Sequence, residues 1–418
     1  MAAVFVLVAV TAPCTAFSQP GSSLATNEKR ERQLVDEIRR VQSEQGPHSA
    51  ALIKPLKALA FLYQDRGDHN REAVAIVRAL QIVRTNYGLY SLDQAPLLRQ
   101  SIRNEEARGD AASAWRIEQN LLTLIKRHRD DLRTVPILRE IADGRMDLLK
   151  RYAAGAYVPQ VVWGCYFDPP WRRPQSGSSS ALGNCLSGTK DMAIQSILFE
   201  AQRYYRDAIG ILRRNKGSAS PELRELEMNI ARSSYVYRRY QAPRVDAFGK
   251  GLASSAYQIG RRSLRHLLED DIENSEPLLN RMKSLVRIAD WDLLFKDNGG
   301  ALDSYEQAYE KLHAGGVPQA STEQLFSPKV PVVLPTFLPN PLASAGQNKA
   351  AGYIDVAFDI TKFGNSQHIH VLGATRNATR VAKRHLIRLI RDSTFRPRVK
   401  DGGFANRTPV VLRYYLTD

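Results

Sequence analysis

The sequence predicts a mainly α-helical protein in which a solenoid of stacked helices is followed by a small α+β domain. Two observations support this class. Apolar residues recur at helical spacing from Glu28 to about Leu312, in segments separated by Gly, Asp and Pro turns. After a proline-rich break, residues 350–418 contain two alternating apolar runs, a helical stripe and a last alternating run. A chain of 418 residues, 43% of them apolar, is long enough for two or three domains.

The first expected element is an uncharged N-terminal segment. Residues 1–17 carry no charged side chain, and an apolar core from Ala2 to Val10 leads to small residues. This pattern is typical of a secretory signal peptide, which we expect at residues 1–18. Pro13 interrupts the apolar run well short of the roughly 20 residues that a spanning helix needs. The alternative is an uncleaved anchor in the inner membrane.

The chain is strongly basic, with a formal net charge of +16 at pH 7. In an exported protein, such a balance favours anionic partners of the cell envelope, such as lipid headgroups, over nucleic acid. The alternative is that the charge serves solubility on solvated helix faces.

The helical body, expected at residues 28–315, repeats a spacing of small and large side chains. One helical stripe ends at Gly67 and a second begins at Glu72, which predicts a helix-turn-helix hairpin. Small side chains seven residues apart let a partner helix approach, while the large side chain between them, four residues after the first, fills the groove. The residues of this pattern are Leu56, Leu59, Ala60, Tyr63, Glu72, Ile76, Ala79 and Leu80, then Ala201, Tyr205 and Ala208, then Ala301, Tyr305 and Ala308.

At these residues the body resembles the tetratricopeptide repeat family. The resemblance implies a right-handed solenoid that presents a concave surface to a protein or peptide partner. After Gly109 the small-large-small pattern can be placed in two ways, on Ala111, Trp115 and Glu118 or on Ala114, Glu118 and Leu121. Further helices are expected at Glu222–Tyr240, which Ser220 and Pro221 would open, at Leu252–Leu268 and at Glu276–Phe295.

A segment without helical pattern, residues 158–190, interrupts the body. Between residues 158 and 185 it holds two Trp, two Cys and four Pro, which no regular helix tolerates. Cys165 and Cys185 predict a disulfide in an oxidising compartment. Closing a loop of this size would stabilise the folded state by roughly 3 kcal/mol. A recognition loop would use residue types that dominate interfaces, here Trp163, Tyr166, Trp171 and Arg172. The alternative is a stapled loop that only caps the solenoid.

Motifs of enzymatic chemistry are almost missing from the sequence. No phosphate-binding glycine loop, zinc-binding histidine pair or nucleophile elbow occurs. Ser187 and Lys190 match the Ser-x-x-Lys of serine acyl enzymes, so an envelope hydrolase with its site near residues 163–190 is an alternative. His368 and His370 alternate on an expected strand, but no third metal ligand accompanies them. We expect no catalytic activity, cofactor or metal.

Five prolines between residues 327 and 347 predict an extended spacer of about 3.1 Å per residue and roughly 60 Å in reach. The strand Tyr353–Thr361, a turn at Gly364 and a second strand around Ile369 and Val371 should follow. Ile354, Val356, Phe358 and Ile360 are expected to face inward. A helix is expected at Asn377–Arg391 with Val381, Ala382, Leu386, Leu389 and Ile390 buried, then a strand at Thr408–Leu416.

The order β-β-α-β, with Phe395, Pro397 and Arg398 after the helix, resembles the C-terminal domain of the TonB energy transducers over residues 350–418. In that family the domain is periplasmic and adds an extended segment of an outer-membrane receptor to a sheet edge, so the resemblance implies a docking module. The transducers have an inner-membrane helix and then a long proline-rich spacer, where this chain has a signal-like segment and a solenoid. We therefore expect a non-enzymatic periplasmic adaptor, with a membrane-anchored transducer as the alternative.

The expected C-terminal helix carries a single basic stripe. Arg380, Arg384, Arg388 and Arg391 follow one another at spacings of four, four and three, opposite the apolar stripe. Residues 350–418 hold twelve Lys and Arg against five Asp and Glu. This excess favours an acidic receptor segment or an anionic envelope surface as partner, and the alternative is a solvated helix face.

Overall fold

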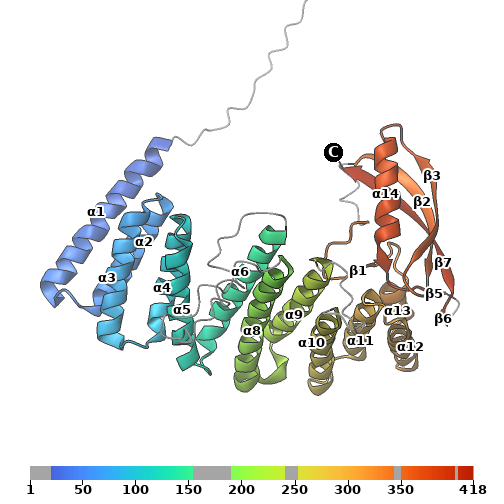
Figure 1. Cartoon of the computed structure of the whole chain (residues 1–418), viewed down its shortest axis with the longest axis horizontal. Coiled ribbons are helices and arrows are strands. Elements are labelled where there is room, and N and C mark those ends of the chain that lie inside the picture. Colours follow the sequence, from blue (N-terminus) through green and yellow to red (C-terminus); the bar gives the residue numbers. More distant parts are fainter. Residues whose placement is uncertain (1–19, 154–189, 241–252, 343–349, 401–402, 418) are drawn as a thin grey trace, which may run out of the picture. The chain divides into compact units, whose positions relative to one another are not determined.

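The computed structural model describes residues 20–153, 190–240, 253–342, 350–400 and 403–417. Stacked helical hairpins are followed by a small α+β region with an antiparallel sheet, so the predicted fold class is confirmed (Figure 1). The chain forms two compact units, residues 1–129 and 130–418. The α+β region therefore belongs to the same unit as the later helical hairpins.

The first unit contains one long helix and two hairpins. A 3-10 turn precedes the first helix of each hairpin, capped by Ser49 in one and Ser91 in the other. Asp68 and Asp110, forty-two residues apart, cap the second helices by accepting hydrogen bonds from the backbone at distances of 3.1 and 2.9 Å. The elements are α1 (Pro20–Gln45), η1 (Ala50–Leu52), α2 (Ile53–Asp65), α3 (His69–Tyr87), η2 (Leu92–Gln94), α4 (Ala95–Ala107) and α5 (Ala111–Arg127).

The predicted small-and-large pattern is buried in both units, as expected of repeat cores. All eight residues that were predicted for α2 and α3 are buried, as are the two later triplets, Ala201–Tyr205–Ala208 and Ala301–Tyr305–Ala308. Ala114 and Leu121 are buried, whereas Ala111 and Trp115 are partly exposed, so the second alignment is correct. Buried Glu72 accepts a hydrogen bond from Gln100 Nε2 at 3.1 Å, which explains how a carboxylate occupies a position of small residues.

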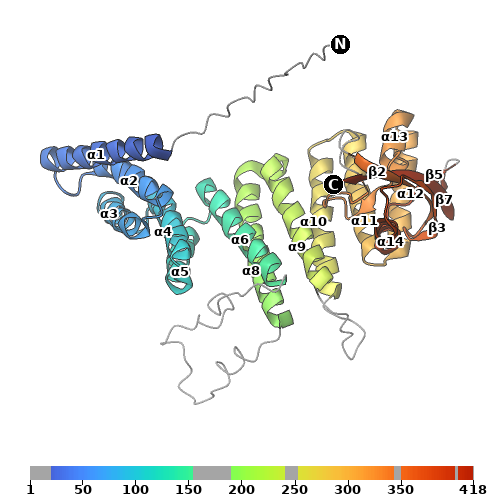
Figure 2. The same ribbon diagram turned by 90° about the horizontal axis from the view of Figure 1, so that it is seen from above.

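Helices of the second unit pack against their successors in the chain from α6 to α12 (Figure 2). The three further helices expected from the sequence are present, and α9 begins at Pro221 as predicted. The elements are η3 (Leu132–Thr134), α6 (Val135–Ala153), α8 (Lys190–Lys216), η6 (Gly217–Ala219), α9 (Pro221–Tyr240), α10 (Ala253–Glu273), α11 (Leu278–Leu294), α12 (Asn298–Ala314) and α13 (Gln319–Phe326).

The α+β region is a three-stranded antiparallel sheet of order β3-β2-β7, with α14 against one face (Figure 1). The four residues of β2 that were predicted to face inward pack there against Leu386 and Ile390 of α14. The elements are β1 (Val333–Leu334), β2 (Ala350–Thr361), β3 (Ser366–Ala374), α14 (Arg380–Asp392), β4 (Thr394–Phe395), β5 (Val399–Lys400), β6 (Gly403–Phe404) and β7 (Arg407–Thr417).

The prediction of burial is wrong for one residue of the apolar stripe on α14. Val381 is 73% exposed. At 100° per residue it lies about 140° around the helix from Leu386 and about 180° from Ile390, so it faces solvent when those two face the sheet.

The expected extended spacer takes another form over its described part, residues 327–342. Val333 and Leu334 form β1, which pairs antiparallel with β4. Leu342 is buried in the core beneath the sheet. Apolar side chains between the prolines therefore hold this segment against the α+β region, so a reach of roughly 60 Å is not realised there.

Candidate binding surfaces

The two edges of the C-terminal sheet differ in regularity. The sheet order leaves β3 and β7 as its edge strands. β3 has two register shifts against β2, and His368 within it has a φ of 50°. By contrast, β7 pairs with β2 without a register shift from Leu416 back to Arg407. The β7 edge is therefore the longer regular template for another strand.

The backbone of β7 directs alternate residues to β2 and to the free edge. The carbonyl of Asn406 accepts a hydrogen bond from the Lys362 N–H at 3.3 Å, so even-numbered positions point toward β2. Pro409 has no N–H and fits an outward position, because an inward proline would remove a ladder bond. The N–H and C=O groups of Val411, Arg413 and Tyr415 therefore point outward. Within the described part of the chain, no backbone partner meets these groups.

Side chains beside this edge are held in place on the open face of the sheet. Arg413 lies directly opposite Asp355 and donates two hydrogen bonds to its carboxylate, each at 2.8 Å. Its guanidinium also stacks 4.0 Å from the ring centre of Tyr353. The hydrogen bond from Arg413 lowers the pKa of Asp355. Val411 beside them is 69% exposed and offers an apolar contact.

The predicted basic stripe lies on the exposed face of α14. Arg380, Arg384, Arg388 and Arg391 are all exposed, while Leu386 and Ile390 are buried on the other side. These four residues are referred to below as the arginine row. Among the residues that the structure describes, no carboxylate forms an ion pair with any member of the row.

Three other predicted partner-binding residues are buried or half-buried against their own chain. Phe395 is fully buried, with its ring centre 5.4 Å from that of Phe358. Pro397 is also buried. Arg398 is half-buried and donates to the carbonyl of Pro328 at 2.9 Å. The Phe-x-Pro-Arg stretch therefore packs against its own chain, and its side chains do not form an open surface.

Arg396, the second residue of the Phe-x-Pro-Arg stretch, was not singled out from the sequence. Arg396 donates to Asp290 of α11 at distances of 2.9 and 2.6 Å, and both side chains are at least nine-tenths buried. Tyr305 of α12 donates to the same carboxylate at 2.7 Å, and burial raises the pKa of its phenol well above the ordinary value. Phe404 packs 5.8 Å from Tyr305 and 5.6 Å from Phe326. These contacts fasten the sheet region to the last helical hairpin.

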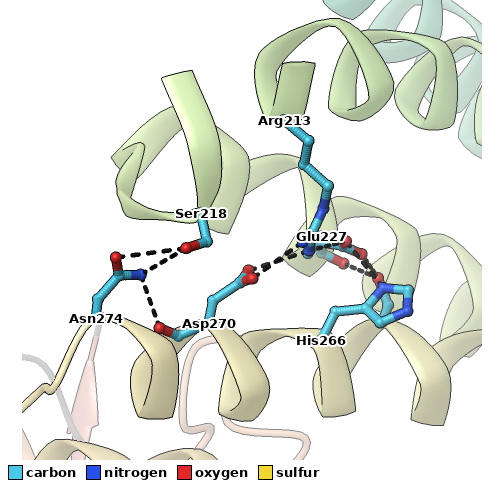
Figure 3. Close-up of polar contacts among 7 residues, drawn as sticks. Arg213, Ser218, Glu227, His266, Asp270 and Asn274 are labelled. Atoms are coloured by element: carbon cyan, nitrogen blue, oxygen red, sulfur yellow. Dashed lines mark hydrogen bonds and ion pairs between the residues drawn. The ribbon is translucent and has the colours of Figure 1, made fainter. Parts of the chain in front are cut away.

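A second buried polar cluster joins α8, α9 and α10 (Figure 3). Glu227 accepts hydrogen bonds from Ser263, from His266 at 3.1 Å and from Arg213 at 3.3 Å. Arg213 also donates twice to Asp270, at 3.1 Å each. Ser263 and His266 both meet the carboxylate and not each other, so the order of a Ser-His-acid triad is absent from this cluster. The cluster fastens three helices together.

The pKa values of two side chains in this cluster are raised by their surroundings. The hydrogen bond to Glu227 raises the pKa of His266 above its ordinary value of 6.5. Burial raises the pKa of Asp270, against the opposing effect of Arg213. Removing one partner of these buried carboxylates would leave an uncompensated charge inside the protein, so the side chains of the cluster depend on one another in the folded state.

Several predictions fall outside the described residues. The signal peptide at residues 1–18, the disulfide Cys165–Cys185 and the recognition residues Trp163, Tyr166, Trp171 and Arg172 lie there, as does Ser187. They stay predictions. In the described ranges, no group of three His, Cys, Asp or Glu side chains is arranged to hold a metal ion. Each helix in the described ranges is too short or too polar to span a lipid bilayer.

Comparison with known proteins gives only distant structural likenesses. The chain matches no protein-family profile and no curated protein. It is similar to the crystal structure of BtubC (BKLC) from P. vanneervenii, with a TM-score of 0.32 and 13% identity, over 78% of this chain and 97% of the other. It is also similar to the C-terminal part of a TPR repeat-containing protein from Cytophaga hutchinsonii, with a TM-score of 0.26 and 9% identity, over 72% and 96% of the two chains. Stacked helical hairpins are seen in the structure of this chain itself, and similarity at this level does not extend to function.

Proposed function

We propose that this protein is a non-enzymatic periplasmic adaptor that docks an extended segment of an envelope partner at the β7 edge. The observation that carries this proposal is the outward row of backbone groups at Val411, Arg413 and Tyr415, on an edge strand with regular pairing. A second protein would bind the helical hairpins, because stacked helical repeats present extended surfaces suited to protein partners.

Strand addition suits the chemistry of this edge. An incoming extended peptide would pair with the outward N–H and C=O groups, and main-chain hydrogen bonds would supply much of the affinity. The fixed Arg413–Asp355 pair and the exposed Val411 would contact alternate side chains of the peptide. The resemblance of the β-β-α-β order to TonB C-terminal domains also supports this mode of binding.

The test removes one outward N–H in one variant and changes only the side chain at the same position in a second variant. Val411→Pro deletes the N–H and leaves the ladder to β2 intact, as Pro409 already does two residues earlier. Val411→Thr changes the side chain and keeps the N–H. Peptides would be selected on the full-length wild-type protein from a displayed random library, and binding to the variants would then be measured.

We expect the selected peptides to lose most of their affinity for Val411→Pro and to keep it for Val411→Thr. Residue-resolved hydrogen exchange should show that bound peptide protects the amides of Val411, Arg413 and Tyr415. Equal binding to both variants, or protection confined to the helical hairpins, would refute docking at β7. Hydrogen exchange at the β2 amides of each variant without peptide verifies that the sheet remains folded.

A further inference from the structure

The arginine row of α14 forms a straight ridge of positive charge on the outside of the α+β region. Spacings of four, four and three residues keep all four side chains within about 80° around the helix. The first and last are eleven positions apart, or about 16 Å along the axis at 1.5 Å per residue. Because the helix packs on the sheet through its opposite face, the ridge points away from the protein.

Within the isolated protein, the charges in the first turns of this helix are unfavourably placed, although Arg391 in the last turn suits the helix dipole. Arg380 is the first residue after the N-cap Thr379, where the helix dipole disfavours a cation, and the first turn has no acidic residue. Arg380 with Arg384, and Arg384 with Arg388, are like charges four residues apart, which repel each other. Asp392, at the far end, is the one carboxylate of the helix. An external anion would relieve this repulsion.

Arginines elsewhere in the same unit are used differently. Arg139 donates to Glu225 at 2.9 Å, Arg261 to Asp292 at 2.7 Å, and Arg413 to Asp355 at 2.8 Å. In each case the chain provides the carboxylate. For the arginine row it provides none among the described residues, so the row is available to an external partner.

We propose that the arginine row binds the surface of a lipid bilayer rich in anionic headgroups. A convex, straight ridge can touch a flat surface along its whole length, whereas an acidic peptide is usually held in a groove. The positive charge of the row is attracted to the negative headgroups of such a bilayer. Val381, at the margin of the row, is the exposed apolar side chain that would touch the interface, so binding is electrostatic and shallow.

The expected attraction is weak and reversible. Each arginine near an anionic bilayer surface strengthens binding by about fivefold. Screening shortens the reach of the charges from about 10 Å at 0.1 M salt to about 3 Å at 1 M, so the binding should disappear at high salt. This inference does not depend on strand docking, because α14 and the β7 edge carry separate groups.

The experiment measures sedimentation of the full-length protein with vesicles of phosphatidylcholine alone or mixed with phosphatidylglycerol. The test variant is Arg384→Glu/Arg388→Glu. The matched control, Arg262→Glu/Arg265→Glu, makes the same charge change at two exposed residues of α10. A third variant, Arg384→Lys/Arg388→Lys, keeps the charge.

We expect binding to the anionic vesicles only, lost at high salt. The test variant should bind at least about 30-fold more weakly, since two favourable charges are removed and then reversed. The α10 control and the lysine variant should bind within a few-fold of wild type. An equal loss in both Glu variants would mean that only net charge matters and would overturn the assignment, as would binding to soluble polyglutamate without binding to vesicles.

Discussion

The helical hairpins of the second unit and helix α14 of the α+β region use arginine in opposite ways. In the hairpins, Arg213 and Arg261 reach buried carboxylates on neighbouring helices. On α14, the arginine row faces solvent with no carboxylate from the described residues. A buried charge must find its partner within the chain, whereas an exposed one is free to meet a partner outside it.

Arg396 is the exception that joins the two regions. It belongs to the α+β region by sequence, yet its guanidinium lies buried against Asp290 of α11. Because of this contact and the packing of Phe404, the sheet is held on the last hairpin. The β7 edge is therefore presented on a fixed support, so the proposed docking would carry no further cost of ordering the edge.

The largest effect is expected from breaking this buried pair. Asp290→Ala would leave Arg396 buried without its carboxylate and should lower the free energy of unfolding of the second unit by about 3–5 kcal/mol. Denaturant unfolding, followed by hydrogen exchange in α11 and α12, would measure it. The matched control is Asp303→Ala, at an exposed position of α12, which should change stability by less than about 0.5 kcal/mol.

The double variant Asp290→Leu/Arg396→Leu sharpens the comparison. With both charges replaced by apolar side chains, most of the lost stability should return, because no unpaired charge stays buried. If the double variant is no more stable than Asp290→Ala, the damage comes from lost packing and not from the orphaned charge.

A smaller effect is expected from the protonation of His266. Glu227 raises the pKa of His266, so the folded state favours the protonated ring. This stabilisation is complete below the pKa of the unfolded chain and is lost as pH rises through the raised pKa of the folded state. Between about pH 5.5 and pH 8.5, wild type should therefore lose more stability than His266→Gln. Parallel pH profiles of the two proteins would show that the ring does not contribute.

The smallest effect is expected at the solvent-accessible pair of Arg413 and Asp355. Asp355→Ala should change the melting temperature far less than Asp290→Ala, because water screens an exposed pair. The lowered pKa of Asp355 means that its contribution is present above the unfolded pKa and is lost as pH falls through the folded pKa. A thermal melt at neutral pH and at acid pH measures both effects. A loss comparable to that of Asp290→Ala would contradict the distinction between inward and outward charge.

Local patterns in the sequence predict most of the elements. The hairpin of α2 and α3, the strands β2 and β7 and the helix α14 all follow from apolar spacing within a few residues, which the backbone periods of 3.6 and 2 impose. The exposure of the arginine row follows from the same periodicity. Where the period was misapplied, as at Val381, the expectation of burial was wrong.

The sequence by itself determined the elements and the exposed charge of α14, because both depend on neighbours one or two turns away. Only the tertiary structure decided which arginines are buried and how the proline-rich segment folds. Arg396 and Asp290 are 106 residues apart, and no spacing rule connects them. The position of β7 as a regular edge was likewise decided by its pairing with β2, since an edge is defined by the strand that is missing beside it.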